Sequence, residues 1–222
     1  MEVIVVLGVI AVLVALLLPT LGRARERART ARCRSNLQQI GIGLRLYLDD
    51  HGHYPRNLSW IRLGPWELWV CPSRRVTEPR NREYYPGDYL ENAVGSGSGL
   101  PTLPHLGVWT AVDDKPRPRE QFGTRLAVFK GRQDSEIVAP ADMLTVGELN
   151  RWLMEVILPP TPSDPFRWGM CQNIEYRHYG RANSLFGDSH LETDKPEQLV
   201  GPSEVVRRRW NYDNLPHNEN WR

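Results

Sequence analysis

Cysteine is scarce in this sequence, which has three in 222 residues: Cys33, Cys71 and Cys171. Three cysteines cannot build the dense disulfide framework of a small secreted domain, and none of them has the CxxC spacing of a zinc knuckle. Cys71 and Cys171 both fall in the part of the chain that we expect to be globular. An oxidising compartment would permit one bridge between them, and two separate, partly buried thiols are the alternative.

The sequence also lacks a strong net charge, which is +2 at pH 7. A nearly neutral chain gives no electrostatic argument for binding nucleic acid, and we expect no such partner. Its arginines are nevertheless clustered, between residues 23 and 34 and again at 207–209. We interpret these clusters as a solvated helix face and a surface tail.

Three common enzyme motifs are missing. No serine or cysteine lies in a nucleophile elbow, no glycine-rich phosphate loop is present, and no HExxH motif occurs. We therefore expect no catalytic residue, no resident metal and no cofactor, and the chain is not predicted to be an enzyme.

The sequence has only one long hydrophobic run. Sixteen consecutive apolar or glycine residues extend from Val3 to Leu18, directly behind Glu2. As a helix the run would be about 24 Å long, slightly short of a bilayer core of about 30 Å. A cleavable secretory signal would have basic residues before the run and a small-residue cleavage site after it. Because this run has neither, it is interpreted as a retained membrane anchor.

A helical pattern continues beyond the anchor. Pro19 would end or kink a soluble helix, but it is tolerated at the end of a membrane helix. An apolar stripe at helical spacing follows, formed by Leu37, Ile40, Leu44, Tyr47 and Leu48. The segment 49–55, with a glycine and a final proline, is a helix stop. The first fifty or so residues are therefore predicted to form one long helix, with its first third in lipid.

Helical periodicity fades from Trp60 onward. Short segments rich in β-forming residues follow, at Glu67–Val70, Arg125–Phe129, Met143–Val146 and Ala182–Phe186. The sequence predicts an α+β fold, in which the long N-terminal helix, its first part transmembrane, packs on a small and mainly antiparallel sheet. We divide the chain into a transmembrane and assembly helix, residues 1–53, and a loop-rich globular β domain, residues 54–222.

The N-terminal residues resemble a known family. Glu2, the apolar run and Pro19 are similar to the N-terminal helix of type IV pilin-like proteins. They most resemble the type II secretion pseudopilins and their relatives with an N-terminal cleavage and methylation motif. The following segment 23–44, which contains the step Cys33-x-x-Asn36-Leu37, is also similar to those relatives.

Segments near the C-terminus resemble a subgroup with a His-x9-Asp-Gly signature. His178 and Asp188 stand at the signature spacing, Ser189 replaces its glycine, and His190 follows. Cys71-Pro72-Ser73 and the stretches 138–143 and 209–217 are also similar to this subgroup. The stretch 74–132 has no such resemblance.

The resemblance implies a structural subunit of a type II secretion pseudopilus or type IV pilus-like filament, assembled through the helix that carries Glu2 and Pro19. A carboxylate at the edge of an apolar run is costly in lipid unless it is paired. The family is understood to pair it with the N-terminal ammonium of a neighbouring subunit, and the alternative is a residue that snorkels into the headgroups. The implied partners are other pilin-like subunits, a prepilin peptidase and inner-membrane lipid.

The N-terminus departs from the family pattern. In the family a basic leader ending in glycine is cut before the mature residue that becomes methylated, whereas only Met1 precedes Glu2 here. A mis-assigned start or a trimmed sequence is the simplest explanation, and loss of processing is the alternative.

The arginines after the apolar run conflict with the membrane orientation of the family. The positive-inside rule would place the arginines at 23–34 in the cytoplasm. We follow the family instead and expect a single-pass inner-membrane protein with a periplasmic domain.

Two other functions stay open. His178, Asp188 and His190 are a plausible metal set, which would suit an anchored metallohydrolase. The triplet 187–189 equally suggests a hairpin turn in which Asp188 accepts backbone hydrogen bonds, and we favour this turn over a calcium site or a catalytic metal.

The second open function is carbohydrate binding, because aromatic side chains form platforms for sugars. The sequence has eight tryptophans: Trp60, Trp66, Trp69, Trp109, Trp152, Trp168, Trp210 and Trp221. We favour the interpretation that they anchor the core and the loops of a small sheet.

Overall fold

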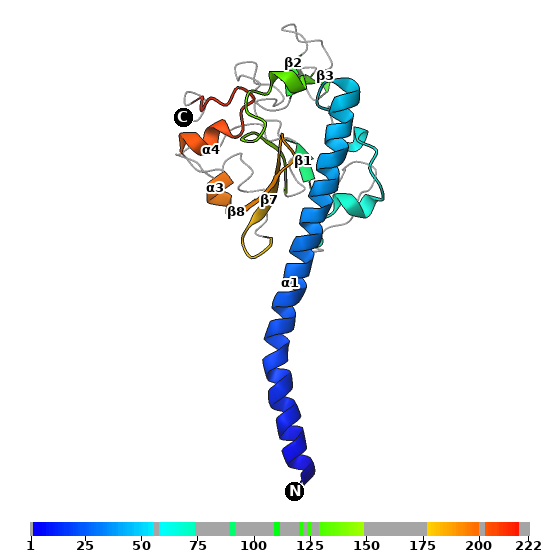
Figure 1. The fold of residues 1–222 in the computed structure, drawn as a ribbon, viewed down its shortest axis with the longest axis vertical. Coiled ribbons are helices and arrows are strands. Elements are labelled where there is room, and N and C mark those ends of the chain that lie inside the picture. Colours follow the sequence, from blue (N-terminus) through cyan, green and yellow to red (C-terminus); the bar gives the residue numbers. More distant parts are fainter. Residues whose placement is uncertain are drawn as a thin grey trace.

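The structure is a computed structural model of the chain, with a long N-terminal helix that projects from a small α+β head (Figure 1). It describes residues 2–55, 58–73, 89–91, 109–111, 120–121, 124–125, 129–148, 177–199 and 203–217. The predicted fold class is confirmed: one long helix and a small antiparallel sheet.

Helix α1 extends from Glu2 to His51 without interruption, which corresponds to about 75 Å. It continues through Pro19 and ends at the predicted stop, where Gly52 has a φ of +73° and its N–H donates to the Leu48 carbonyl at 2.7 Å. Glycine takes this left-handed conformation without strain, so it terminates the helix. The long helix predicted from the sequence is confirmed.

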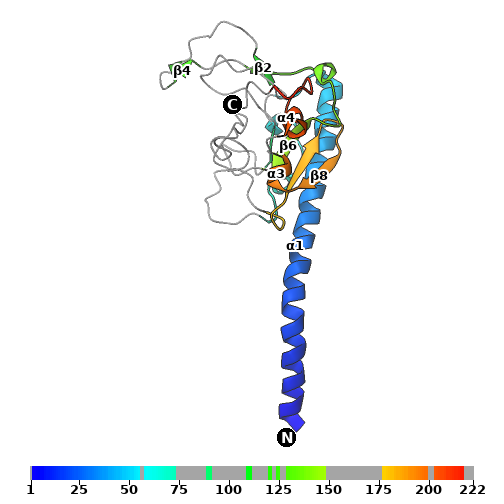
Figure 2. The same cartoon turned by 90° about the vertical axis from the view of Figure 1, so that its left-hand side faces the viewer.

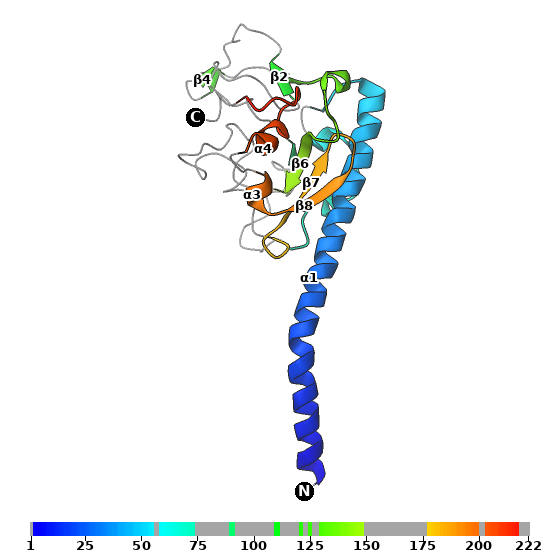
Figure 3. The same ribbon diagram turned by 60° about the vertical axis from the view of Figure 1, so that its left-hand side comes forward.

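The two halves of α1 have different surroundings. Its buried residues all lie in the C-terminal half: Cys33, Asn36, Leu37, Ile40, Gly41, Gly43, Leu44 and Leu48. The predicted apolar stripe is thus the face that packs on the head, with Tyr47 partly buried at its edge. The N-terminal half projects away from the head in all three views (Figures 1, 2 and 3).

The head is built on a four-stranded antiparallel sheet in the order β1-β6-β7-β8. The strands are β1 (Tyr89–Glu91), β6 (Leu144–Glu148), β7 (Ala182–Phe186) and β8 (Leu191–Asp194). The predicted strands at Met143–Val146 and Ala182–Phe186 correspond to β6 and β7. Every residue of these two central strands is buried, because both faces of the sheet are covered.

Smaller elements surround this sheet. Strand β2 (Trp109–Ala111) pairs with β5 (Phe129–Gly131), and β3 (Glu120–Gln121) pairs with β4 (Thr124–Arg125). The predicted strand Arg125–Phe129 therefore touches the end of β4 and the start of β5, and residues 126–128 lie outside the described part. Helices α3 (Pro196–Leu199) and α4 (Glu204–Arg208) lie across the sheet from α1 (Figures 1 and 3).

The strand predicted at Glu67–Val70 is wrong. The 3-10 helix η2 occupies Trp66–Trp69, with i to i+3 hydrogen bonds such as Leu68 N–H to the Pro65 carbonyl at 3.0 Å. Two further 3-10 helices are η1 (Leu58–Trp60) and η3 (Asp134–Glu136). Leu68 and Trp69 are buried in the core, so packing of a tight turn overrides the β-forming tendency of these residues.

A single hydrophobic core joins α1 to the head. Its buried members come from both sides of the predicted 53/54 division, and include Leu37, Leu44, Leu58, Val146 and Leu185. The division into residues 1–53 and 54–222 stays a prediction, but the second half of α1 contributes to the same core as the sheet.

Candidate functional site

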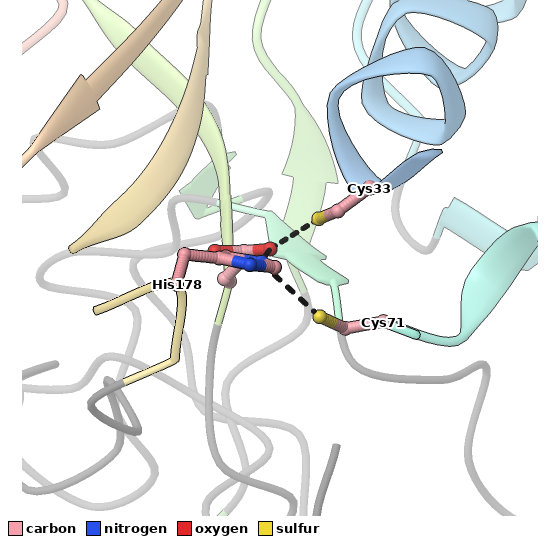
Figure 4. A group of neighbouring side chains, drawn as sticks. Cys33, Cys71 and His178 are labelled. Atoms are coloured by element: carbon pink, nitrogen blue, oxygen red, sulfur yellow. Dashed lines mark hydrogen bonds and ion pairs between the residues drawn. The ribbon is translucent and has the colours of Figure 1, made fainter. Parts of the chain in front are cut away.

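Four polar side chains from distant parts of the chain meet inside the head. Cys33 comes from α1, Cys71 from the segment after η2, Glu148 from the end of β6, and His178 from the turn before β7. Figure 4 shows Cys33, Cys71 and His178 pointing toward one another. One ligand atom of each of the four residues lies within 4.8 Å of those of the others, and all four residues are buried. We call this group the four-residue cluster.

His178 is the centre of the four-residue cluster. Its Nε2 atom lies 2.9 Å from Oε1 of Glu148 and 3.4 Å from Sγ of Cys71. Its Nδ1 atom faces the opposite way, 3.0 Å from Oγ1 of Thr30 and 3.3 Å from Oγ of Ser73. The ring therefore has one nitrogen in the cluster and the other held by hydroxyl groups.

Backbone conformation places this ring. His178 and Tyr179 both have positive φ angles, +49° and +60°, and they are followed by Gly180 at +79°. A non-glycine residue in this region is strained by about 1–3 kcal/mol. Such strain persists only where the surrounding structure imposes it. Here the turn brings the His178 ring against Thr30 of α1.

Cys33 and Glu148 have further partners. Sγ of Cys33 contacts Oε1 of Glu148, and it lies 3.2 Å from the hydroxyl of Tyr89. Asn183 donates from its backbone N–H to Oε2 of Glu148 at 2.8 Å, and from Nδ2 to Sγ of Cys33 at 3.4 Å. Because these groups are buried, the hydrogen bonds fix the orientation of the thiol and of the carboxylate.

Burial and the neighbouring groups shift the pKa of each of the four residues in the cluster. Burial acts to lower the pKa of His178, but Cys71 and Glu148 raise the pKa of His178 to about 10. A hydrogen bond with Cys33, helped by one with His178 and opposed by burial, lowers the pKa of Cys71 to about 6. Burial, Cys71 and Glu148 raise the pKa of Cys33 far above its usual value. Burial opposes ionisation of Glu148, but His178 holds the pKa of Glu148 below its usual value.

These atoms can act chemically in two ways. Two sulfurs, an imidazole nitrogen and a carboxylate oxygen are the donor types that zinc takes in proteins. Two neighbouring sulfurs can also be oxidised to a disulfide. Burial separates all four groups from solvent, so the cluster does not present an accessible nucleophile.

The predicted signature residues do not form one site. Asp188, Ser189 and His190 lie in the tight connection between β7 and β8, at the other end of β7 from His178. Oδ1 of Asp188 accepts a hydrogen bond from the backbone N–H of His190 at 3.0 Å, and it lies 2.5 Å from Nδ1 of the His190 ring. The predicted hairpin turn is therefore present, and the three-residue metal set of His178, Asp188 and His190 is not brought together.

Sequence reasoning found His178 but missed its three partners. Cys33 and Cys71 each lie in a segment that shares the pilin-like resemblance, and this was the available signal. No such signal marked Glu148, because an acidic residue at the end of a strand is common. The sequence leaves open whether Cys71 forms a bridge with Cys171, and Cys171 lies outside the described residues.

Glu2 and Pro19, which the sequence predicts to act in assembly, lie on the projecting half of α1. None of the apolar stretch that begins after Glu2 is buried in the protein, and α1 is the one helix in the described part of the chain that is long and apolar enough to cross a membrane. Pro19 lies inside the helix and is exposed. A segment that is apolar on every side needs lipid or other helices around it.

The tryptophans whose side chains are described are mostly structural. Trp69 and Trp210 are buried, and the indole N–H of Trp210 donates to the Leu199 carbonyl at 2.7 Å. Trp60 is 53% exposed. The side chains of Trp66 and Trp109, and all of Trp152, Trp168 and Trp221, lie outside the described part.

Comparison with known families gives one match. Residues 22–60 match the model of a family described as a protein of unknown function, DUF1559. The matched segment contains Cys33 and the buried stripe of α1. Comparison with curated proteins and with solved structures gives no match. This match and the apolar helix fit a single-pass envelope protein.

Proposed function

We propose that the protein is a structural subunit of a pseudopilus or pilus-like filament, anchored in the inner membrane with its head on the periplasmic side. Its partners are other subunits with similar helices and a prepilin peptidase. The protein acts through assembly, without catalysis and without binding nucleic acid.

The observation that carries the proposal is the division of α1 into two environments. Its C-terminal half supplies the core of the head, while the apolar run at residues 3–18 projects as a rod in which every residue is exposed. An anchor alone requires only a membrane span. A rod continuous with the core helix also fixes the head relative to the membrane, as a filament subunit requires.

Glu2 supports assembly in particular. It is the first residue of α1, ahead of the exposed residues Val3 and Ile4. An unpaired carboxylate is costly at membrane depth, and an ammonium group of a neighbouring subunit would neutralise it. The two other functions lack comparable support, because the four-residue cluster is buried and Trp60 is the one described tryptophan side chain that is exposed.

Photo-crosslinking in membranes tests the proposal. A photoreactive amino acid in place of Val9, which is 55% exposed, should give cross-links between helices of neighbouring subunits. Glu2→Ala should preserve membrane insertion but reduce these cross-links more than tenfold, since loss of one partner of a buried pair costs about 3–5 kcal/mol.

Glu67→Ala is the matched control, because Glu67 is an exposed carboxylate on η2, far along the chain from the apolar run. It should leave the cross-linking yield unchanged. Cross-links to lipid alone in the wild type, or equal yields with and without Glu2, would contradict an assembly role.

A further inference from the structure

We propose that Cys33, Cys71, Glu148 and His178 bind one zinc ion, and that this ion fastens α1 to the sheet. The inference does not depend on the proposed filament function, because it concerns only how the helix is held on the head.

The donor types and their spacing support zinc. Around a tetrahedral zinc ion, with bonds of about 2.0–2.3 Å, neighbouring donors lie about 3.3–3.8 Å apart. Nε2 of His178 lies 3.4 Å from Sγ of Cys71 and 2.9 Å from Oε1 of Glu148, and all four donors lie within 4.8 Å of one another. Small side-chain movements would bring them around one ion. Two thiolates with an imidazole favour zinc over the hard cations calcium and magnesium.

The surroundings of His178 have the form expected for a metal ligand. A zinc-binding histidine generally presents one nitrogen to the metal while its other N–H is held by an oxygen acceptor. Here Nδ1 lies near the hydroxyls of Thr30 and Ser73 and 3.5 Å from Oε1 of Glu26. Ser73 in turn donates to Glu26 at 2.5 Å. Nε2 is thereby left pointing into the cluster.

The other donors are held in a similar way. Asn183 donates to the carboxylate of Glu148 and to the sulfur of Cys33, and Tyr89 lies beside the same sulfur. Hydrogen bonds of this kind orient carboxylate and thiolate ligands in metal sites.

The site is closed, which points to a structural role. Structural zinc sites have four protein ligands, whereas catalytic sites keep a position open for water or substrate. All four residues here are buried and come from chain positions as distant as 33 and 178. The metal displaces protons from the donor groups when it binds, and its binding free energy is added to the stability of the fold.

A Cys33–Cys71 disulfide is the competing chemistry, because the periplasmic orientation would expose the head to oxidants. A disulfide would use only the two sulfurs. It would not explain why the donor atoms of Glu148 and His178, which are buried beside the sulfurs, point to the same place. Zinc uses all four groups.

Metal analysis of the full chain in detergent, purified from membranes without chelator, tests the inference. About one zinc per chain is expected. After removal of the metal, Co²⁺ should bind and give a thiolate-to-cobalt charge-transfer band together with the intense visible bands of a tetrahedral site. The metal-free chain should recover one zinc per chain on titration with zinc alone.

Variants locate the site. Cys71→Ser and Glu148→Gln should each remove the cobalt charge-transfer band or shift it and leave little zinc. Thr30→Val, which removes a hydroxyl next to Nδ1 of His178, should weaken zinc binding by about 10–100-fold. Asp188→Asn and His190→Gln alter an exposed carboxylate–imidazole pair outside the cluster, and they should leave the zinc content unchanged.

The zinc content and the cobalt spectrum of the wild-type protein test the inference even where a variant fails to fold. Absence of zinc and of any cobalt spectrum in the reduced, folded wild type would overturn the inference. So would peptide mapping that finds Cys71 in a disulfide, with either Cys33 or Cys171, in metal-free protein taken from membranes.

Discussion

Gly41 of α1 lies directly against Leu185 of β7: a Cβ atom added at Gly41 would be 2.9 Å from Cδ1 of Leu185. Leu185 is fully buried, so its side chain has little room to move away. Glycine weakens a helix by up to about 1 kcal/mol relative to alanine. The close packing of the helix on the sheet explains why glycine is nevertheless found here.

We expect Gly41→Ala to destabilise the protein by about 1 kcal/mol. Overpacking of a core costs about 1–3 kcal/mol, and the improved helix propensity offsets only part of this cost. Gly22→Ala is the control, since no atom lies within 4 Å of its added Cβ. Thermal melts followed by circular dichroism should show opposite shifts for the two variants, and a stabilising effect of Gly41→Ala would show that the contact is loose.

The sequence predicted what depends on local pattern. The length of α1 followed from the apolar run, the stripe from Leu37 to Leu48 and the stop at Gly52, and β7 followed from its β-forming residues. The four-residue cluster depends instead on how the fold brings positions 33, 71, 148 and 178 together. The signature spacing instead grouped His178 with Asp188 and His190, although β7 holds His178 apart from the other two.

The shared core leads to a prediction about truncation. A chain that begins at Tyr54 lacks five buried side chains of α1: Cys33, Leu37, Ile40, Leu44 and Leu48. The four leucine and isoleucine side chains each contribute about 1.5–3 kcal/mol by burial, so together they rival a total stability of about 5–15 kcal/mol. A chain that begins at Arg23 retains them and loses the apolar run.

We therefore expect the chain from Arg23 to be soluble and to melt cooperatively, and the chain from Tyr54 to be aggregated or unfolded. The sequence division at residue 53 alone would instead predict that the chain from Tyr54 is soluble. Size-exclusion chromatography and thermal melts of the two chains provide the check. A well-folded chain from Tyr54 would mean that the sheet does not need the helix.

Ser189 leads to a prediction about strain. Its φ is +72°, a left-handed conformation that costs a non-glycine residue about 1–2 kcal/mol. Ser189→Gly removes this strain but increases the entropy of the unfolded chain, which cancels about 0.4–1 kcal/mol of the gain in stability. A net stabilisation of about 0.5–1 kcal/mol is expected in urea unfolding.

Ser35→Gly is the matched control for this substitution. Ser35 is exposed in the interior of α1, where glycine is unfavourable, so the same change should destabilise the protein by about 0.5 kcal/mol. Equal effects at the two positions would argue against backbone strain at Ser189.

The last prediction concerns Asp188 and its pH dependence. Burial acts to raise its pKa, but hydrogen bonds from His190 hold the pKa of Asp188 below its usual value. A carboxylate with a lowered folded-state pKa adds stability above its unfolded pKa of about 3.9, and loses it as the pH falls through the folded value. By analogy with helix caps, Asp188→Ala should cost about 0.5–2 kcal/mol at pH 7, a shift in melting temperature of about 2–6 °C.

The stability difference between wild type and Asp188→Ala should stay constant from about pH 7 to 5 and shrink below about pH 4. It should also be the same with and without EDTA, because Asp188 is a turn residue outside the four-residue cluster. Thermal melts of both proteins across this pH range, with and without chelator, measure both effects. A shift that EDTA abolishes would mean that Asp188 binds a metal, and the hairpin interpretation would then be wrong.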